Sequence, residues 1–217
     1  VRDAGRAWML AHGQRHREQV VCAVPKCTRP VLPVAGQATR GGNMKKLVAA
    51  IAFAADKHRN QRRKDEEASP YINHPIALAD VLANEAGVED ERVIVAAVLH
   101  DTVEDTETTE QELLRLFGKD VADIVMEVTD DKSLPKEERK RLQVEHAATI
   151  SRRAKLVKLA DKICNLRDIA RHPPADWPLE RKQAYFDWAK SVVDPMRGVH
   201  PGLEAIFDAA YDARPAD

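Results

Sequence analysis

From Met44 onward, hydrophobic residues recur every three to four positions, which is the spacing of amphipathic helices. Glycine or proline separates successive segments of this pattern, for example at Gly87, Gly118 and Pro135. No segment alternates with a period of two over the length of a strand, and no βαβ unit is recognisable. The pattern therefore predicts an all-α fold. After a first helix that opens at Met44, we expect helices at about residues 75–87, 90–100, 109–118, 121–128, 136–147, 155–169, 179–193 and 203–211.

The segment 90–100 is apolar on most sides, which predicts a helix at the centre of the fold. It runs directly into His100 and Asp101, and Glu104 and Asp105 follow three residues later. His100 and Glu104 are four positions apart, as are Asp101 and Asp105, so all four side chains project from one side of about 1.5 helical turns. Neighbouring residues reach one ion only near a bend or a helix end. Such crowded ionisable groups indicate a metal ion, and the alternative is a helix end that frays into an acidic surface loop.

Two further segments supply groups of the same chemistry. His74 lies directly before Pro75, which suits the first turn of a helix. Asp161 lies close to an apolar stripe, where a carboxylate is costly without a partner, and Asn165 follows on the same helical face. Nitrogen and oxygen donors without thiolate argue against a structural zinc site and favour Mn²⁺, with Fe²⁺, Co²⁺ or Zn²⁺ also possible. The candidate ligands are His74, His100, Asp101 and Asp161.

A cluster of four cations, Arg59, Arg62, Arg63 and Lys64, lies about ten residues before His74. The chain from residue 44 carries 27 basic and 33 acidic residues, so it is not a general binder of nucleic acid. Within an acidic body, this cluster is a local attraction for phosphate groups, although a solvated basic face remains the alternative. The residues alone therefore indicate metal-assisted hydrolysis of a phosphorylated substrate.

Residues 1–43 differ from the rest of the chain. They hold seven basic and two acidic residues, and three prolines interrupt a Val-rich segment. We expect a disordered extension, or sequence translated from upstream of a natural start at Met44, with one domain over 44–217. His12, His16, Cys22 and Cys27 match no common zinc-finger spacing. Three cysteines and a longest apolar run of nine residues predict a cytoplasmic protein that does not span a membrane.

Five strings in order resemble the hydrolase domain of the RelA/SpoT family, and most closely its small stand-alone members of the metazoan-SpoT-homologue type. The resemblance extends over roughly residues 44–195. The strings are His-Arg-Asn-Gln-Arg-Arg-Lys-Asp at 58–65, Pro-Tyr-Ile-Asn-His-Pro at 70–75, Leu-His-Asp-Thr-Val-Glu-Asp-Thr at 99–106, Val-Thr-Asp-Asp-Lys at 128–132, and Lys-Leu-Val-Lys-Leu-Ala-Asp-Lys-Ile-Cys-Asn-Leu-Arg-Asp at 155–168.

This resemblance implies an HD-domain helical bundle and a Mn²⁺-dependent guanosine 3′,5′-bis(diphosphate) 3′-diphosphatase, which leaves GDP or GTP and pyrophosphate. His74, His100, Asp101 and Asp161 match the metal ligands of the family. Glu104 and Asp105 match the acidic pair that orients or deprotonates the attacking water. The positions that match or complete the nucleotide pocket are Arg63, Lys64, Lys136, Asn165, Arg181 and Tyr185. The sequence leaves no room for a synthetase domain after the hydrolase, so we expect a protein that degrades the alarmone and does not make it.

Other activities fit the same pocket. A ribose 2′-phosphate presents charge similar to that of a 3′-phosphate, so an NADPH 2′-phosphatase is the first alternative. Another HD nucleotidase or a cyclic-nucleotide phosphodiesterase is a second. An inert nucleotide-binding sensor is a third, and the presence of all four ligands together with Glu104 and Asp105 argues against it.

Overall fold

The computed structural model describes residues 40–216, with side chains from Met44 onward, and within this range the chain is helical and contains no β-strand. The prediction of an all-α fold is confirmed. One isolated bridge joins Arg62 and Pro70 in the loop after the first helix. The elements are α1 (Arg40–Lys57), α2 (Asn73–Asp80), the π-helix η1 (Val81–Glu85), α3 (Glu91–Leu99), α4 (Thr102–Asp105), α5 (Glu110–Phe117), α6 (Lys119–Val128), α7 (Lys136–His146), α8 (Arg152–Arg171), α9 (Leu179–Val193), the 3₁₀-helix η2 (Asp194–Met196) and α10 (Pro201–Asp212).

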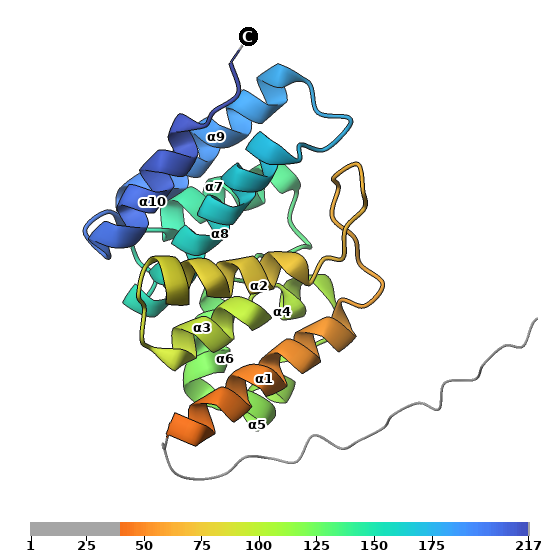
Figure 1. Cartoon of the computed structure of the whole chain (residues 1–217), viewed down its shortest axis with the longest axis vertical. Helices are drawn as coiled ribbons and strands as arrows, with labels where there is room; N and C mark the ends of the chain where they lie inside the picture. Colours follow the sequence, from red (N-terminus) through yellow and green to blue (C-terminus); the bar gives the residue numbers. More distant parts are fainter. Residues whose placement is uncertain (1–39, 217) are drawn as a thin grey trace, which may run out of the picture. The chain divides into compact units, whose positions relative to one another are not determined.

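Helices α3 and α8 form the centre of the core and pack against each other. Every residue of α3 from Val95 to Leu99 is buried, which agrees with its apolar character on most sides. Helices α1, α2 and α6 pack on α3, whereas α9 and α10 pack on α8 (Figure 1). Each buried large apolar side chain stabilises the fold by about 1.5–3 kcal/mol relative to its exposed state. The two central helices therefore hold the residues at their ends and faces in fixed positions.

The chain breaks its helical path where the histidine–aspartate pair lies. Helix α3 ends at Leu99, and Asp101 takes a backbone conformation of φ −97° and ψ 0° before α4 begins. The Thr102 hydroxyl donates to the carbonyl oxygen of Leu99 over 2.7 Å and stabilises this turn. His100 and Asp101 consequently lie at a helix end, which is where neighbouring side chains can face one point.

Three expected boundaries were wrong. Helix α1 begins at Arg40, four residues before Met44, and the remaining prediction for the N-terminal extension concerns residues outside the described range. The segment expected as one helix over 75–87 is divided, because η1 follows α2 as a wider π-turn. Helix α8 begins at Arg152, three residues before the expected start at residue 155, because the Ser151 side chain accepts from the backbone N–H of Ala154 and caps the helix.

Within the described residues, no helix combines the length and the apolar character that crossing a lipid bilayer requires.

Asp90 couples the start of α3 to α8, so its replacement by alanine should destabilise the fold. Its Oδ1 accepts from the backbone N–H of Arg92 over 3.2 Å, and its Oδ2 accepts from Nε of Arg153 over 2.8 Å. Burial acts to raise the pKa of Asp90, but the bonds from Arg92 and Arg153 outweigh it and lower that pKa. We expect D90A to reduce the free energy of unfolding by about 1–2 kcal/mol in urea titrations at pH 7.

The pH dependence provides an internal check on this prediction. Because the folded-state pKa of Asp90 is lowered, its contribution is present above the unfolded-state pKa and disappears as pH falls through the folded-state pKa. The difference between D90A and the parent should therefore shrink in acid. Asp123, a half-exposed acid paired with Lys119, serves as the control, and D123A should change stability by less than about 0.5 kcal/mol. Equal losses in the two variants would contradict the assigned role.

Candidate metal centre and substrate pocket

Three potential metal ligands from two segments of the chain converge at the end of α3. His74 lies in the first turn of α2, and His100 and Asp101 follow α3. Their ligand atoms all lie within 4.8 Å of one another. His74 is 4 % exposed and His100 is 5 % exposed. The fold thus brings together two imidazoles and a carboxylate in a position shielded from bulk water.

The hydrogen bonds of the two histidines leave ring nitrogens available to a cation. Nδ1 of His100 donates to the carbonyl oxygen of Ala97 over 2.8 Å, which leaves Nε2 as the lone-pair nitrogen. Nε2 of His100 lies 2.9 Å from Oδ2 of Asp101 but makes no hydrogen bond to any described residue, and neither does Nδ1 of His74. Buried polar atoms are normally satisfied. The orphan Nε2 of His100 beside the Asp101 carboxylate fits a divalent cation that prefers nitrogen and oxygen ligands, whereas the orphan Nδ1 of His74 lies 4.0 Å from Asp168, on the side of its ring away from Asp161.

Burial and neighbouring charges lower the pKa values of His74 and Asp101 and raise that of His100. Burial lowers the pKa of His74, which favours the neutral imidazole that a metal requires. Burial also acts to lower the pKa of His100, but the charges of Asp101 and Asp161 outweigh it and raise that pKa to about 9. Burial opposes ionisation of Asp101, yet His100 and His74 hold the pKa of this carboxyl well below its usual range. These shifts favour a negative charge on Asp101 and a positive charge beside it, at His100.

Asp161 reaches the centre from a third helix, α8. Its Oδ1 lies 3.2 Å from Nε2 of His74, although it is not one of the three groups whose ligand atoms cluster within 4.8 Å. Lys162 pairs with its Oδ2 over 2.9 Å, and the Asn165 amide donates to its Oδ1 over 2.5 Å. Burial raises the pKa of Asp161, but Lys162 and His74 outweigh it, so that the pKa lies well below its ordinary value. Asp161 is therefore an ionised carboxylate at the edge of the cluster, and Lys162 and Asn165 fix its orientation.

Helix α4 places the two acids Glu104 and Asp105 beside this cluster. Glu104 Oε2 accepts from the backbone N–H of Asp130 over 3.2 Å, and its Oε1 lies 3.8 Å from Arg139. Burial and the nearby charge of Asp101 raise the pKa of Glu104 to about 7. A carboxylate with this pKa can accept a proton near neutral pH. Asp105 pairs with Lys132 and accepts from the Gln61 amide over 2.7 Å.

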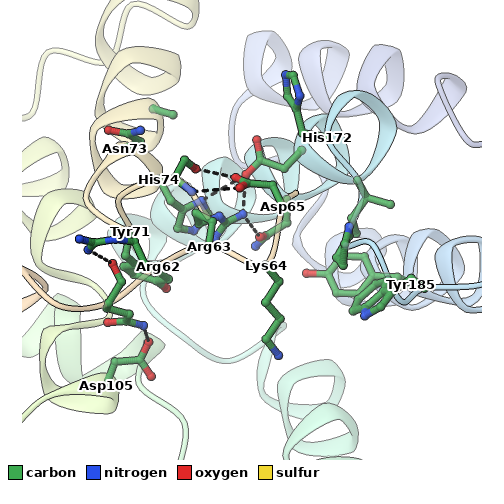
Figure 2. A pocket seen from close by; sticks show the side chains of 18 of the residues that line it. Arg62, Arg63, Lys64, Asp65, Tyr71, Asn73, His74, Asp105, His172 and Tyr185 are labelled. Atoms are coloured by element: carbon green, nitrogen blue, oxygen red, sulfur yellow. Dashed lines mark hydrogen bonds and ion pairs between the residues drawn. The ribbon is translucent and has the colours of Figure 1, made fainter. Parts of the chain in front are cut away.

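Two cavities meet at these groups and have several lining residues in common. The first, of about 610 Å³, extends along the loop 61–69 toward His172 and Trp177 (Figure 2). The second, of about 390 Å³, is lined by the metal cluster and both acids and extends to the cations of α7. Both volumes lie in the range of about 300–1,000 Å³ that is typical of small-molecule sites. The lining residues common to both are Arg63, Lys64, Tyr71, His74, Asp105, Asn165 and Tyr185.

The structure brings most of the predicted substrate residues to these walls. Arg63, Lys64, Asn165 and Tyr185 line both cavities, and Lys136 lines the second. Arg63 pairs with Asp168 and donates to the side-chain amide oxygen Oδ1 of Asn165 over 3.4 Å. In Figure 2 the Lys64 side chain points away from Arg63, so the two cations face different parts of the pocket.

Arg181 is the exception among the predicted substrate residues, since it lines neither cavity. Its guanidinium lies 4.3 Å from the centroid of the Trp177 ring, which does line the first cavity. Its charge also contributes, after burial and Lys140, to the lowered pKa of Lys136. Arg181 therefore acts on the wall of the pocket rather than forming it.

Sequence reasoning missed four residues that contact the candidate centre. Tyr71 donates to Asp101 and stacks edge-on against His74, with ring centroids 5.9 Å apart. Lys132 and Arg139 pair with the two acids, and Lys162 pairs with Asp161. Tyr71, Lys132 and Lys162 lie inside the strings that carry the family resemblance, so the resemblance could have identified all three. Arg139 lies in a run of charges without any distinguishing feature.

Comparisons with known proteins match this chain to one protein family and to several named relatives. Residues 50–185 match the HD domain family. Two proteins named guanosine-3′,5′-bis(diphosphate) 3′-pyrophosphohydrolase MESH1 are each 56 % identical, from Xenopus tropicalis over 76 % of this chain and 92 % of the relative, and from Homo sapiens over 80 % and 97 %. The bifunctional (p)ppGpp synthase/hydrolase SpoT of Escherichia coli is 37 % identical over 77 % of this chain and 25 % of its own length.

A solved structure, described as a metazoan ortholog of SpoT that hydrolyses ppGpp and plays a role in starvation responses, has the same fold. It aligns with a TM-score of 0.76 and 49 % identity over 83 % of this chain and 98 % of that chain. The sequence strings, the helical fold and these relatives agree. The chain is a hydrolase of the HD-domain family and belongs to the small metazoan-SpoT-homologue type within the RelA/SpoT group.

Proposed function

We propose that this chain is a divalent-metal-dependent 3′-pyrophosphohydrolase of guanosine 3′,5′-bis(diphosphate), which yields GDP and pyrophosphate, and GTP from the 5′-triphosphate form. The observation that carries this proposal is the convergence of a histidine–aspartate cluster, two acids and a cationic wall on adjoining cavities. Relatives that carry this activity in their names are 52–58 % identical and are covered over 88–97 % of their length, which supports the substrate.

We infer that Mn²⁺ is the cofactor and that His74, His100, Asp101 and Asp161 would hold it. The mixed nitrogen and oxygen donors, the absence of thiolate and the orphan Nε2 of His100 support this choice. When bound, such a cation supplies Lewis-acid activation of water and of phosphoryl oxygens.

The chain's own residues supply the proton transfer and the charge neutralisation. Hydrolysis forms a bond between the water oxygen and the phosphorus attached to the ribose O3′, and breaks the P–O3′ bond. Glu104, whose pKa is raised to about 7 by burial and by Asp101, is suited to accept the water proton. Ribose O3′ leaves with a proton and becomes a hydroxyl group. Arg63, Lys64 and Lys136 are placed to neutralise the phosphate oxygens, which reduces the charge that the transition state must bear.

Removing divalent metal with EDTA should abolish hydrolysis, and Mn²⁺ should restore it. The expected reason is that without the cation nothing at the cluster supplies Lewis-acid activation of water and of phosphoryl oxygens. Adding Mn²⁺ to the stripped protein should also raise the midpoint of thermal unfolding in a concentration-dependent manner, because a ligand that binds only the folded state stabilises it. Full activity of the stripped protein in EDTA would contradict the metal requirement.

The substrate is tested by a panel of ppGpp, pppGpp, NADPH, deoxynucleoside triphosphates and cyclic nucleotides with Mn²⁺, in which the products are identified. We expect GDP and pyrophosphate from ppGpp. Hydrolysis of NADPH without hydrolysis of ppGpp would contradict the proposed substrate but would agree with the proposed metal centre. Binding of nucleotides by the Mn²⁺-loaded protein without turnover of any would favour a sensor.

A further inference from the structure

His58 is a buried histidine outside the candidate ligand set. It follows the last residue of α1 and is only 2 % exposed. Its Nδ1 lies 2.6 Å from Oε1 of Gln61, and its ring lies against that of Tyr71 with centroids 4.9 Å apart. A buried polar ring with one short, directed hydrogen bond is placed more strictly than packing alone requires.

The direction of the hydrogen-bond chain follows from its end at Asp105. An ionised carboxylate can only accept, so the Gln61 amide nitrogen donates to Asp105 Oδ2 over 2.7 Å (Figure 2). The amide oxygen of Gln61 must then face His58, whose Nδ1 must carry the proton. Nε2 of His58 has no hydrogen-bond partner among the described residues. The chain therefore runs from His58 through Gln61 to Asp105 in one consistent sense.

A second route leads from the same histidine to the metal cluster. Tyr71, against which the His58 ring packs, donates its hydroxyl hydrogen to Asp101. The backbone N–H of Tyr71 donates to the carbonyl oxygen of Gln61 over 3.1 Å, so the two contacts of His58 are also linked to each other. His58 is thus connected to Asp105 through Gln61 and to Asp101 through Tyr71.

We propose that His58 is a positioning residue that fixes the orientation of Asp105 through Gln61. Asp105 also pairs with Lys132, whose side chain is half-exposed in the loop before α7. Because this side chain is free to move, the pair alone does not fix the orientation of the Asp105 carboxylate. The neutral Gln61 amide, held from behind by His58, supplies a second, fixed donor and so limits the movement of the Asp105 carboxylate, which lines both cavities. This inference rests on the proposed function, because it takes Asp105 to act on the attacking water.

Two substitutions at His58 separate the hydrogen bond from the packing. H58F keeps the ring against Tyr71 but has no donor, and H58N keeps a side-chain N–H at about the position of Nδ1. With Mn²⁺ and ppGpp, we expect H58F to lower kcat by about 10- to 100-fold with little change in KM or Mn²⁺ affinity. H58N should recover most of this loss. Gln111, an exposed glutamine on α5, is the control, and Q111L should leave kcat unchanged. Equal losses in H58F and H58N would overturn the proposal.

A double-mutant cycle tests whether His58 acts through Asp105. In a D105A background, H58F should change the residual single-turnover rate by less than about twofold, because the group it positions is absent. An undiminished H58F effect in that background would overturn the proposal.

The tautomer of His58 gives a readout that does not depend on activity. Nitrogen NMR of the His58 ring should show the proton on Nδ1, and Q61L should perturb that signal. A proton on Nε2 would overturn the proposal. Failure of the parent protein to hydrolyse ppGpp would instead contradict the proposed function, and would leave the tautomer result standing as a separate test of the relay.

Discussion

Replacement of Asp161 by asparagine is expected to abolish metal binding and hydrolysis together. Asp161 is the only candidate ligand that comes from α8, and its Oδ1 lies 3.2 Å from Nε2 of His74. Asparagine keeps the volume of the side chain but removes the negative charge that a cation requires. We expect the affinity for Mn²⁺ to fall by at least about 100-fold and kcat/KM to fall by about three orders of magnitude, or ~4 kcal/mol.

Calorimetric titration with Mn²⁺ and steady-state kinetics measure the two effects in the same preparation. D187N is a matched control, because Asp187 is an exposed acid on α9 that pairs with Arg214. It should leave both quantities unchanged. A D161N protein that binds Mn²⁺ normally and hydrolyses ppGpp at the parental rate would remove Asp161 from the ligand set.

The alanine variant at Asp161 carries a second, structural effect. Lys162 is 3 % exposed and pairs with Asp161, while its ammonium lies 4.5 Å from the centroid of the Trp188 ring. Burial acts to lower the pKa of Lys162, but Asp161 outweighs it and raises that pKa. Both variants remove the charge that pairs with Lys162, and breaking a buried ion pair costs about 3–5 kcal/mol. Asparagine keeps a side-chain oxygen that can accept from Lys162, whereas alanine leaves this ammonium without an acceptor, so D161A should unfold at a lower temperature than D161N. The comparison separates loss of the metal from loss of the fold.

Most of the helical fold was predictable because its helices are amphipathic and have clear ends. The predicted helix 179–193 coincides with α9, and Gly118 ends α5 as expected. Errors arose where the hydrophobic pattern carries no information. Arg152 and Arg153 add no apolar position to α8, so only the cap at Ser151 marks its true start. The π-turn in η1 leaves the apolar period of its segment almost unchanged, and so the sequence offers no sign of it.

The candidate site was predictable where a polar group interrupts an apolar stripe. Asp161 within α8 and His100 at the end of α3 both stand out in this way. Arg139 does not, because α7 is charged throughout and has no buried residue to indicate which face meets the core. Lys132 reaches the two acids only because the loop between α6 and α7 crosses beside α4. Contacts of this kind depend on how helices distant in sequence are arranged, and spacing alone cannot encode them.

Replacement of Glu104 by glutamine is expected to keep the metal and lose most of the turnover. Glu104 lies outside the proposed ligand set of His74, His100, Asp101 and Asp161, so the affinity for Mn²⁺ should stay within about threefold of the parent. Its carboxylate accepts from the Asp130 N–H and lies near Arg139, which holds it beside the cluster. An amide of the same shape cannot accept the water proton, so kcat should fall by about 10²–10⁴-fold. E107Q is the control, because Glu107 is largely exposed and pairs with Lys57.

The pH profile distinguishes a proton acceptor from a residue that only shapes the pocket. Burial raises the pKa of Glu104 to about 7, and the charge of Asp101 adds to the shift. A general base acts in its deprotonated form, so kcat/KM of the parent should rise with pH through the pKa of Glu104. Because a cation at the cluster would offset the charge of Asp101, that rise should be centred below pH 7 in the metal-loaded enzyme. The residual activity of E104Q should lack this rise, and an E104Q profile that parallels the parental one would assign the base to another group.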